Sequence, residues 1–168
     1  MQVFEAIRKR RSIRRYKKAN VEQDKLEMVL EAARLSPSAA NMQPWRFVVI
    51  SKEESREKMR LVYNADWLVQ APVIIVACGI PTEAWTRADG EKYWQVDVSI
   101  AMQSLILTAT ELGLGTCWIA NFDEEEARRI IGIPKSWKVL ALTPLGYPDE
   151  EKGPVRHRKP LKDIVHIF

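Results

Sequence analysis

Hydrophobic residues follow two different periods along the chain, and these predict both helices and strands. In some segments they recur every three or four positions, the spacing of one helical face, and in others they form short β-branched runs typical of buried strands. The expected helices are a short one from residue 3 to the basic residues that begin at 9, then 21–35, 52–62, 94–112 and 123–131, with a turn or short helix at 64–70. The expected strands are 47–50, 73–77, 116–119 and 139–143.

The helix expected at residues 94–112 is the longest of these segments, and it is apolar on nearly all sides. Such a helix should be buried on both faces, which is compatible with a central helix shared with another subunit. Two shorter helices carry end signals. Asn20 is a candidate cap for helix 21–35, which Pro37 ends, and Asp123 is a candidate cap for the last helix.

Residues 36–50, with the sequence SPSAANMQPWRFVVI, begin as a loop and end as a strand. Pro37 and Pro44 exclude a continuous helix, because neither has a backbone N–H and each favours extended geometry in the residue before it. The small and amide side chains between them would let the backbone approach a flat ligand and hydrogen-bond to its edge. These residues leave a second interpretation open, an ordinary helix-to-strand connection without a ligand.

Length and composition favour one globular domain, residues 1–168, with a full hydrophobic core. No window approaches the roughly 18–20 apolar residues that span a bilayer, and the N-terminus lacks the apolar segment of a signal peptide. A cytoplasmic location without a membrane partner is therefore expected. Cys78 and Cys117 lie in apolar surroundings and form no C-x-x-C pair, which favours buried, reduced thiols over a disulfide or metal-ligand role.

Basic residues crowd residues 9–18, which read KRRSIRRYKK. Such a run can be a solvated face or a nonspecific polyanion patch. Ser12 among the arginines, with Ile13 and Tyr16 as apolar anchors, also fits a phosphate clamp, because guanidinium forks and a hydroxyl match phosphate oxygens. The net charge of +4 suits anionic small molecules and does not require nucleic acid.

Several common chemistries lack their residues in this sequence. There is no Walker loop, and the G-x-G of Gly113 and Gly115 follows a helix and opens a strand, the reverse of a dinucleotide fingerprint. His157 and His166 are the only histidines, and both lie near the C-terminus. Neither a histidine metal site nor a Ser-His-Asp triad is expected, and no metal is predicted.

Four stretches, in order along the chain, together resemble motifs of the nitroreductase-like FMN-dependent oxidoreductase family, small-subunit type. They are RRSIR at 10–14, SPSAANMQPW at 36–45, ELGLGTCWIANF at 111–122, and PLGYP at 144–148 followed by Arg156, His157 and Arg158. The resemblance spans nearly the whole chain. It implies an α+β fold with a mostly antiparallel sheet surrounded by helices, and an intertwined homodimer with FMN at the subunit interface.

The resemblance also implies cofactor contacts in five groups. The phosphate, the ribityl chain and the N1/O2 side of the ring would be held by Arg10, Arg11, Ser12 and Arg14, and the phosphate would be closed over by Arg156 and Arg158. The flavin would be reached from the partner subunit by Pro37, Ser38, Ala39 and Asn41, with Gln43 supporting the loop. Flavin N5 would face Trp118, Ile119, Ala120 and Asn121, and a further amide contact to the flavin would come from Asn64.

The expected function is transfer of hydride from NAD(P)H to the flavin and then to a small acceptor such as a nitroaromatic or quinone. No side chain is expected to act as nucleophile or general base. Arg14 would stabilise negative charge around N1 and the C2 carbonyl of the reduced ring, and several arginines suit the phosphate charge.

Two departures from the family pattern leave the substrate open. Ala120-Asn121 stands where many longer members have Glu-Gly, and the insertion that covers the substrate side is much reduced, between Gly79 and Trp94. Reductive dehalogenation or flavin fragmentation is therefore the alternative within the family. A basic nucleic-acid-binding module that uses residues 9–18 is the alternative from a different class, although no groove-reading motif accompanies the charge.

Dimerisation is expected to be a condition for flavin binding. Helix 94–112 is too apolar for one chain to bury twice, and the tail looks too apolar for a free terminus. The expected interface is well over roughly 2,000 Å² in total. An interface charge, Ala101→Glu, should then separate the subunits and release FMN.

Overall fold

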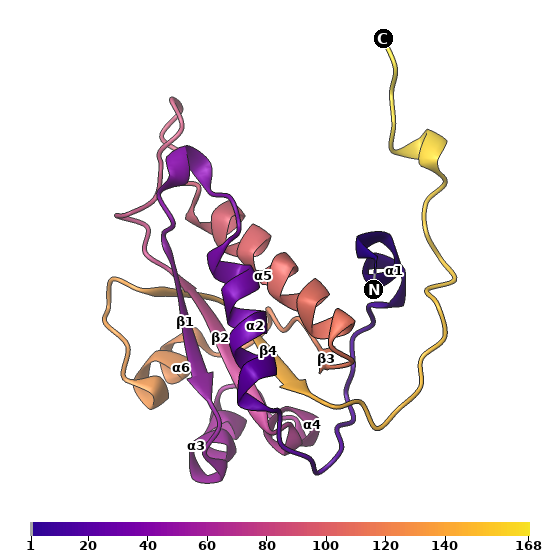
Figure 1. Cartoon of the computed structure of the whole chain (residues 1–168). Coiled ribbons are helices and arrows are strands. Elements are labelled where there is room, and N and C mark those ends of the chain that lie inside the picture. The colour runs from indigo at the N-terminus through magenta and orange to yellow at the C-terminus, as the bar shows by residue number, and fades with distance from the viewer. Residues whose placement is uncertain (1) are drawn as a thin grey trace.

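A four-stranded antiparallel sheet forms the centre of the protein in a computed structural model that describes residues 2–168 (Figure 1). The strands are β1 (Trp45–Ile50), β2 (Val73–Gly79), β3 (Gly115–Thr116) and β4 (Lys138–Gly146). They lie in the order β1-β2-β4-β3, and every neighbouring pair is antiparallel. β1 and β3 are the edge strands, and β3 has only two residues.

Helices cover both faces of this sheet. The α-helices are α1 (Val3–Lys9), α2 (Gln23–Arg34), α3 (Glu53–Lys58), α4 (Asp66–Gln70), α5 (Trp94–Glu111) and α6 (Glu124–Ile131); the 3-10 turns are η1 (Ala39–Asn41), η2 (Met59–Leu61) and η3 (Leu161–Asp163). α5 runs beside α2 along the sheet, as Figure 1 shows. The sequence prediction of an α+β fold with an antiparallel sheet and surrounding helices is confirmed.

β2 explains why the sheet is covered on both faces. All seven of its residues are buried. Because side chains alternate along a strand, Ile75 and Ala77 point into the core under α2 and α5, whereas Ile74 and Val76 point into the core under α4 and α6. A strand buried on both faces needs a continuous apolar run, which residues 73–77 supply.

Gly79 lets α5 start against the end of β2. A Cβ atom at this position would lie 2.3 Å from Trp94 Cε3. Any larger residue would push Trp94 away, and with it the first turn of α5. This contact fixes the N-terminal end of the longest helix to the sheet.

Most expected helices and strands are present, with three local corrections. The helix expected at 52–62 is α-helical only in α3, and the 3-10 turn η2 follows it. The strand expected at 116–119 ends at Thr116, and only an isolated bridge between Ile119 and Leu142 continues the pairing. Asn20 does not cap α2, because the cap position is Glu22 and its side chain makes no capping hydrogen bond. Asp123 does cap α6, since its side chain accepts a hydrogen bond of 2.9 Å from the Glu126 N–H.

α5 also corrects the proposed interface substitution. Ala101 is completely buried in the core of its own chain. Ala101→Glu would therefore disrupt the fold of a single chain, and it is the wrong variant for testing an interface. Ile100 is the suitable position, since its side chain is 38% exposed next to the exposed Val96.

The C-terminal tail, residues 153–168, leads away from the body of the protein and is exposed throughout (Figure 1). It nevertheless carries apolar side chains, among them Leu161, 72% exposed, with Ile164, Ile167 and Phe168. None of the helices described in residues 2–168 is long and apolar enough to cross a bilayer. Cys78 and Cys117 are both buried and free, as expected from the sequence.

Candidate functional site

The basic N-terminal segment lies along β3 at the edge of the sheet. The Ile13 N–H donates a hydrogen bond of 2.9 Å to the Thr116 carbonyl, and Ser12 pairs with Thr116 in a parallel bridge. Gly115 permits this close approach, because a Cβ there would lie 2.8 Å from Ile13 Cγ1. Ile13 is buried, so alternation in an extended segment directs Ser12 and Arg14 away from the core.

Glu150 and Lys152 hold this segment from the other side. The Arg14 backbone N–H donates to Glu150 Oε1 at 2.6 Å, and Lys152 Nζ donates to the Ser12 carbonyl at 2.6 Å. Lys152 and Glu150 also form an ion pair at 3.0 Å. Burial raises the pKa of Glu150, but the hydrogen bonds from Arg14 and Lys152 outweigh burial and hold the pKa below its ordinary value.

Because Glu150 bonds the backbone of Arg14, the guanidinium of Arg14 is left for another partner. It lies 5.7 Å from the centre of the Trp67 ring, a cation–π contact. Trp67 belongs to α4, and Asn64 is exposed in the turn just before that helix. Arg14 and the predicted flavin-contacting amide thus lie on neighbouring elements.

The arginines predicted to bind the cofactor differ from most others in the protein. Within residues 2–168, none of them forms a side-chain ion pair with an acidic residue; they are Arg10, Arg11, Arg14, Arg156 and Arg158. Six arginines outside the predicted site each pair with an acid; they are Arg15, Arg34, Arg46, Arg60, Arg87 and Arg129. Guanidinium groups without an acidic partner are available to an anionic ligand.

Arg11 stands apart from the other N-terminal arginines. It lines a pocket of about 220 Å³ together with Lys9, Ile13 and Lys152. It shares this side with the buried Ile13, whereas Ser12 and Arg14 point the opposite way. The structure therefore divides the N-terminal motif between two sides of the segment.

The predicted N5-facing residues follow directly after β3. Backbone hydrogen bonds in both directions, 2.9 and 3.0 Å, tie Ile119 to Leu142 of β4. Ile119 is buried, while Trp118 is 38% exposed and Ala120 and Asn121 are exposed. Since Ser12 pairs with Thr116, the N-terminal motif and residues 118–121 lie on one continuous edge of the protein.

The tail arginines come within reach of this edge without touching it. Arg156 follows the anchored Lys152 by four residues, a span of at most roughly 14 Å in an extended chain. Arg158 makes only a weak hydrogen bond of 3.4 Å to the His157 carbonyl. Both arginines are exposed on the part of the tail that leaves the body of the protein.

The loop of residues 37–43 has an unusual backbone. Ala40, Asn41 and Gln43 have φ angles of 49°, 55° and 50°, in the left-handed region that residues other than glycine rarely adopt. The Gln43 backbone N–H donates to Ser38 Oγ at 2.9 Å, and Gln43 Nε2 donates to the Asn41 carbonyl at 3.0 Å. Pro37, Asn41 and Gln43 are exposed, and Ser38 and Ala39 are half-buried.

This loop and the basic edge lie at opposite ends of α5 (Figure 1). The Ala39 N–H donates to Asp97 Oδ1 at 2.9 Å, in the first turn of α5. β3 begins just after the other end of that helix. α5 has 18 residues and is therefore roughly 27 Å long. Within one chain, the loop and the basic edge do not line a common pocket.

The sequence was compared with models of known protein families. A model described as the nitroreductase family matches residues 7–63 and 59–147. The chain belongs to the nitroreductase family.

Individual family members match over most of their length. A relative from Methanothermobacter thermautotrophicus, whose name describes an NADH dehydrogenase/NAD(P)H nitroreductase, is 37% identical over 158 residues, covering 91% of this chain and 81% of its own. The crystal structure of a nitroreductase family protein from Clostridium difficile 630 is 35% identical with a TM-score of 0.91, covering 99% and 98%. An FMN-dependent nitroreductase from Clostridium difficile R20291 is 31% identical with a TM-score of 0.85, covering 98% of each chain.

Relatives of lower sequence identity include proteins named as deiodinases. Human iodotyrosine deiodinase 1 is 27% identical over 195 residues, which cover 96% of this nitroreductase-family chain and 67% of the deiodinase. The prediction from the four motifs that the chain is a nitroreductase-like oxidoreductase is confirmed at the level of the family.

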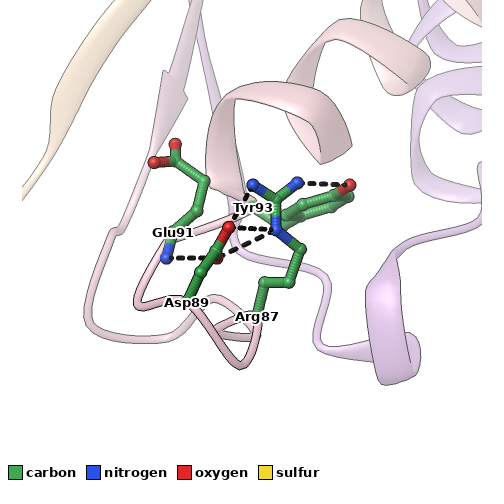
Figure 2. Close-up of polar contacts among 4 residues, drawn as sticks. All are labelled: Arg87, Asp89, Glu91 and Tyr93. Atoms are coloured by element: carbon green, nitrogen blue, oxygen red, sulfur yellow. Dashed lines mark hydrogen bonds and ion pairs between the residues drawn. The ribbon is translucent and has the colours of Figure 1, made fainter.

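The segment between β2 and α5 of this nitroreductase-family member contains a small hairpin, closed by an antiparallel bridge between Thr86 and Lys92. Figure 2 shows the Arg87 guanidinium held between the Asp89 carboxylate and the Tyr93 hydroxyl. The Arg87–Asp89 ion pair measures 2.6 Å, and the Glu91 N–H donates to Asp89 at 3.2 Å. The hydrogen bonds from Arg87 lower the pKa of Asp89. The charges of Arg87 and Asp89 are therefore satisfied within the hairpin.

Four residues that shape this site are not among those predicted from the sequence, namely Glu150, Lys152, Trp67 and Asp97. For Glu150 and Lys152 no local signal exists, since their contacts are 136 and 140 residues away along the chain. Asp97 did carry a signal in the sequence, because it is the one acidic residue within the otherwise uncharged segment 94–110. Across residues 2–168 no cluster of metal-ligating side chains is found.

Proposed function

We propose that this nitroreductase-family member is an FMN-dependent oxidoreductase that uses NAD(P)H to reduce a small acceptor such as a nitroaromatic or a quinone. In this proposal residues 1–168 act as one domain, and the active form is a homodimer with two flavin sites. A cytoplasmic location goes with it, because free, buried cysteines suit a reducing compartment. The observation that carries the proposal is the Arg14 guanidinium, which has no acidic partner within residues 2–168 and follows Ser12 on the edge of the sheet.

The residues present fit the two halves of FMN. The phosphate is close to a dianion, and Arg10 and Ser12 offer a guanidinium and a hydroxyl for it, with Arg156 and Arg158 on a tail long enough to close over it. The ring is flat and uncharged in its oxidised form. It suits an uncharged loop such as residues 37–43, which can present backbone groups and small side chains to it.

When bound, FMN supplies hydride and electron transfer at N5, so the chain needs no nucleophile or general base of its own. The role of Arg14 is electrostatic. Its backbone is fixed by Glu150 and its guanidinium by contact with Trp67, so a positive charge is held in place before any ligand arrives. A preorganised charge of this kind stabilises negative charge that develops on the ring.

The homodimer follows from the distance between the two candidate regions. The loop of residues 37–43 and the basic edge are separated by roughly the 27 Å length of α5, so one chain cannot place both on one flavin. A second copy can bring its loop to the first copy's arginines. The exposed Val96 and Ile100 on α5 and the apolar tail support such a partner, because large apolar patches mark interaction surfaces.

Purified protein tests the proposal directly. It should show oxidised-flavin absorbance, or acquire it when FMN is added, and it should lose that absorbance anaerobically with NADH or NADPH. A panel of nitroaromatics and quinones added to the reduced protein would then identify the acceptor class. Protein that neither contains nor binds FMN would refute the proposal, and bound flavin that resists both nucleotides would refute the reductase activity.

Flavin-dependent reductive dehalogenation is the second candidate. The similarity to a protein named iodotyrosine deiodinase and the small hairpin between β2 and α5 favour it. Product analysis with halogenated phenols and the reduced protein separates the two. Halide release with retention of the ring would support dehalogenation, and absence of halide with turnover of nitroaromatics would exclude it. Parallel incubation with oxygen and analysis of the flavin would detect flavin fragmentation.

A further inference from the structure

A buried carboxylate occupies the first turn of α5. Asp97 is only 1% exposed, and it lies beside core residues such as Val98 and Ala101. Its Oδ1 accepts the Ala39 N–H at 2.9 Å, while its Oδ2 is buried without a hydrogen-bond partner among residues 2–168. Burying an acid that is only half satisfied is unfavourable for stability. A helix that served only to fill the core would carry an apolar residue here.

The loop that Asp97 contacts is itself strained. Three of its residues, Ala40, Asn41 and Gln43, have positive φ angles without being glycine. Backbone strain of this kind persists only where surrounding contacts hold it, and it is concentrated at functional sites. The hydrogen bonds among Ser38, Asn41 and Gln43 lie within the loop and cannot fix it to the body of the protein.

Two side chains on one face of α5 provide that attachment. Asp97 bonds Ala39, the residue just before the strained stretch, and Ser104 bonds the Ser36 hydroxyl at 2.7 Å. Asp97 and Ser104 are seven residues apart, which is two turns of a helix. The two contacts differ in kind: the Asp97 carboxyl group accepts a backbone N–H next to the strained stretch, whereas Ser104 contacts only a side-chain hydroxyl at the start of the loop.

We propose that Asp97 is the positioning residue of the cofactor loop: its carboxylate holds the Ala39 N–H and thereby keeps residues 40–43 in the strained conformation that meets the flavin of the partner subunit. This inference rests on the proposed function, because the loop has a cofactor to meet only if the protein binds FMN. Asp97 acts through the loop and touches neither flavin nor substrate. It preorganises the backbone, so that FMN binding does not have to order it.

Three variants test this role. Asp97→Leu removes the acceptor at similar size, Asp97→Asn keeps an acceptor oxygen for Ala39, and Ser104→Ala removes the neutral contact from the same helix face. FMN affinity is measured by quenching of flavin fluorescence. Asp97→Leu should weaken FMN binding at least about tenfold, roughly the loss expected when the Ala39 N–H is left without an acceptor, while Asp97→Asn and Ser104→Ala should stay within about threefold.

A second readout does not depend on FMN. Amide hydrogen exchange in flavin-free protein should show the Ala39 N–H protected in the wild type, and it should show exchange of residues 39–43 accelerated in Asp97→Leu with α5 and the sheet unchanged. The visible circular dichroism of residual bound flavin should also change in Asp97→Leu and be restored in Asp97→Asn. Rescue by asparagine separates positioning of the loop from a general requirement for a charge.

The outcomes are decisive in each direction. Asp97→Leu with native FMN affinity and native loop exchange would overturn the inference, and so would Asp97→Asn or Ser104→Ala as impaired as Asp97→Leu. If Asp97→Leu does not fold, amide hydrogen exchange of the wild type still tests the inference. An Ala39 N–H that exchanges as fast as in an unstructured peptide would overturn it. Failure of the wild type to bind FMN would refute the proposed function. Amide hydrogen exchange of residues 39–43 would still test whether Asp97 positions the loop.

Discussion

The two ends of α5 solve different recognition problems. At the C-terminal end, β3 and the N-terminal segment present unpaired arginines on regular, extended backbone. At the N-terminal end, residues 37–43 present no charge at all, and their backbone is strained. One end is suited to recognising charge, and the other is suited to recognising shape.

The supporting contacts differ in the same way. Glu150 and Lys152 bond backbone groups of Arg14 and Ser12, so they fix the basic segment and leave the Arg14 guanidinium without an acidic partner. Asp97 bonds the backbone of Ala39 and fixes the shape of the loop. In both places a charged side chain holds main chain rather than another functional side chain. Neither end is a complete binding site for a molecule that has both an anionic group and a flat ring.

The largest expected effect comes from separating two copies of the chain. Ile100→Glu places a charge on the exposed face of α5, where burial of an unpaired carboxylate in an interface is strongly unfavourable. We expect a monomer that has lost FMN, as measured by light scattering and by flavin absorbance of the same fractions.

Leu61→Glu is the matched control, because Leu61 is also exposed but lies on η2, over the other face of the sheet. It should remain a dimer with FMN bound. A monomeric Ile100→Glu that keeps FMN tightly would show that one end of α5 is sufficient, and the comparison between the ends would fail.

The next largest effect concerns charge at the basic end. Arg14→Met removes the unpaired guanidinium, and FMN affinity should fall at least tenfold, roughly the loss of one charge-assisted hydrogen bond. Arg15→Met is the control, since Arg15 is also exposed but pairs with Asp149 at 4.0 Å. It should change FMN affinity less than about twofold. Equal losses in both variants would mean that general positive charge, and not the position of Arg14, binds the cofactor.

The sequence was sufficient for the elements that bury apolar faces. β2 was predictable because its hydrophobic run is continuous and begins after Pro72, and α5 because its apolar residues recur along 18 residues and Gly113 follows its end. For β3 the sequence predicted a strand at 116–119 but not its extent, because the pairing of Gly115 and Thr116 with β4 and Ser12 depends on residues far away in the chain.

The candidate site was also predictable only in part. The motifs pointed to Arg14 and to residues 36–45, but charge and small size in a sequence do not tell which arginines find acidic partners. The sequence does not distinguish Arg87 from Arg14 in this respect, yet of the two only Arg87 forms an ion pair with an acidic residue. The two ends of α5 became visible only in the fold, since each end joins segments that are distant along the chain.

A smaller effect should appear in the pH dependence of stability. The folded-state pKa of Glu150 lies below its ordinary value. Its stabilising contribution is therefore complete above the unfolded pKa of about 4.3 and is lost as the pH falls through the lower folded value. Glu150→Gln should flatten this acidic limb in measurements of the free energy of unfolding, whereas Glu151→Gln, at its exposed neighbour, should leave it unchanged. An unaltered limb in Glu150→Gln would mean that the carboxylate does not hold the basic segment.

The smallest effect is expected at the hairpin near the uncharged end. The segment that contains the hairpin is connected to the loop of residues 37–43, since the Ile80 N–H donates a hydrogen bond of 2.8 Å to the Pro44 carbonyl. A substitution in the hairpin therefore tests whether charge near this loop affects FMN binding. The Arg87 guanidinium is satisfied by Asp89 and Tyr93, and Arg87→Gln should change FMN affinity less than about twofold. Faster amide exchange at Glu91 should be its main consequence, because the Asp89 side chain that accepts this N–H loses its partner. If Arg87→Gln instead released FMN as readily as Arg14→Met, charge would act at both ends of α5 and the division between them would be wrong.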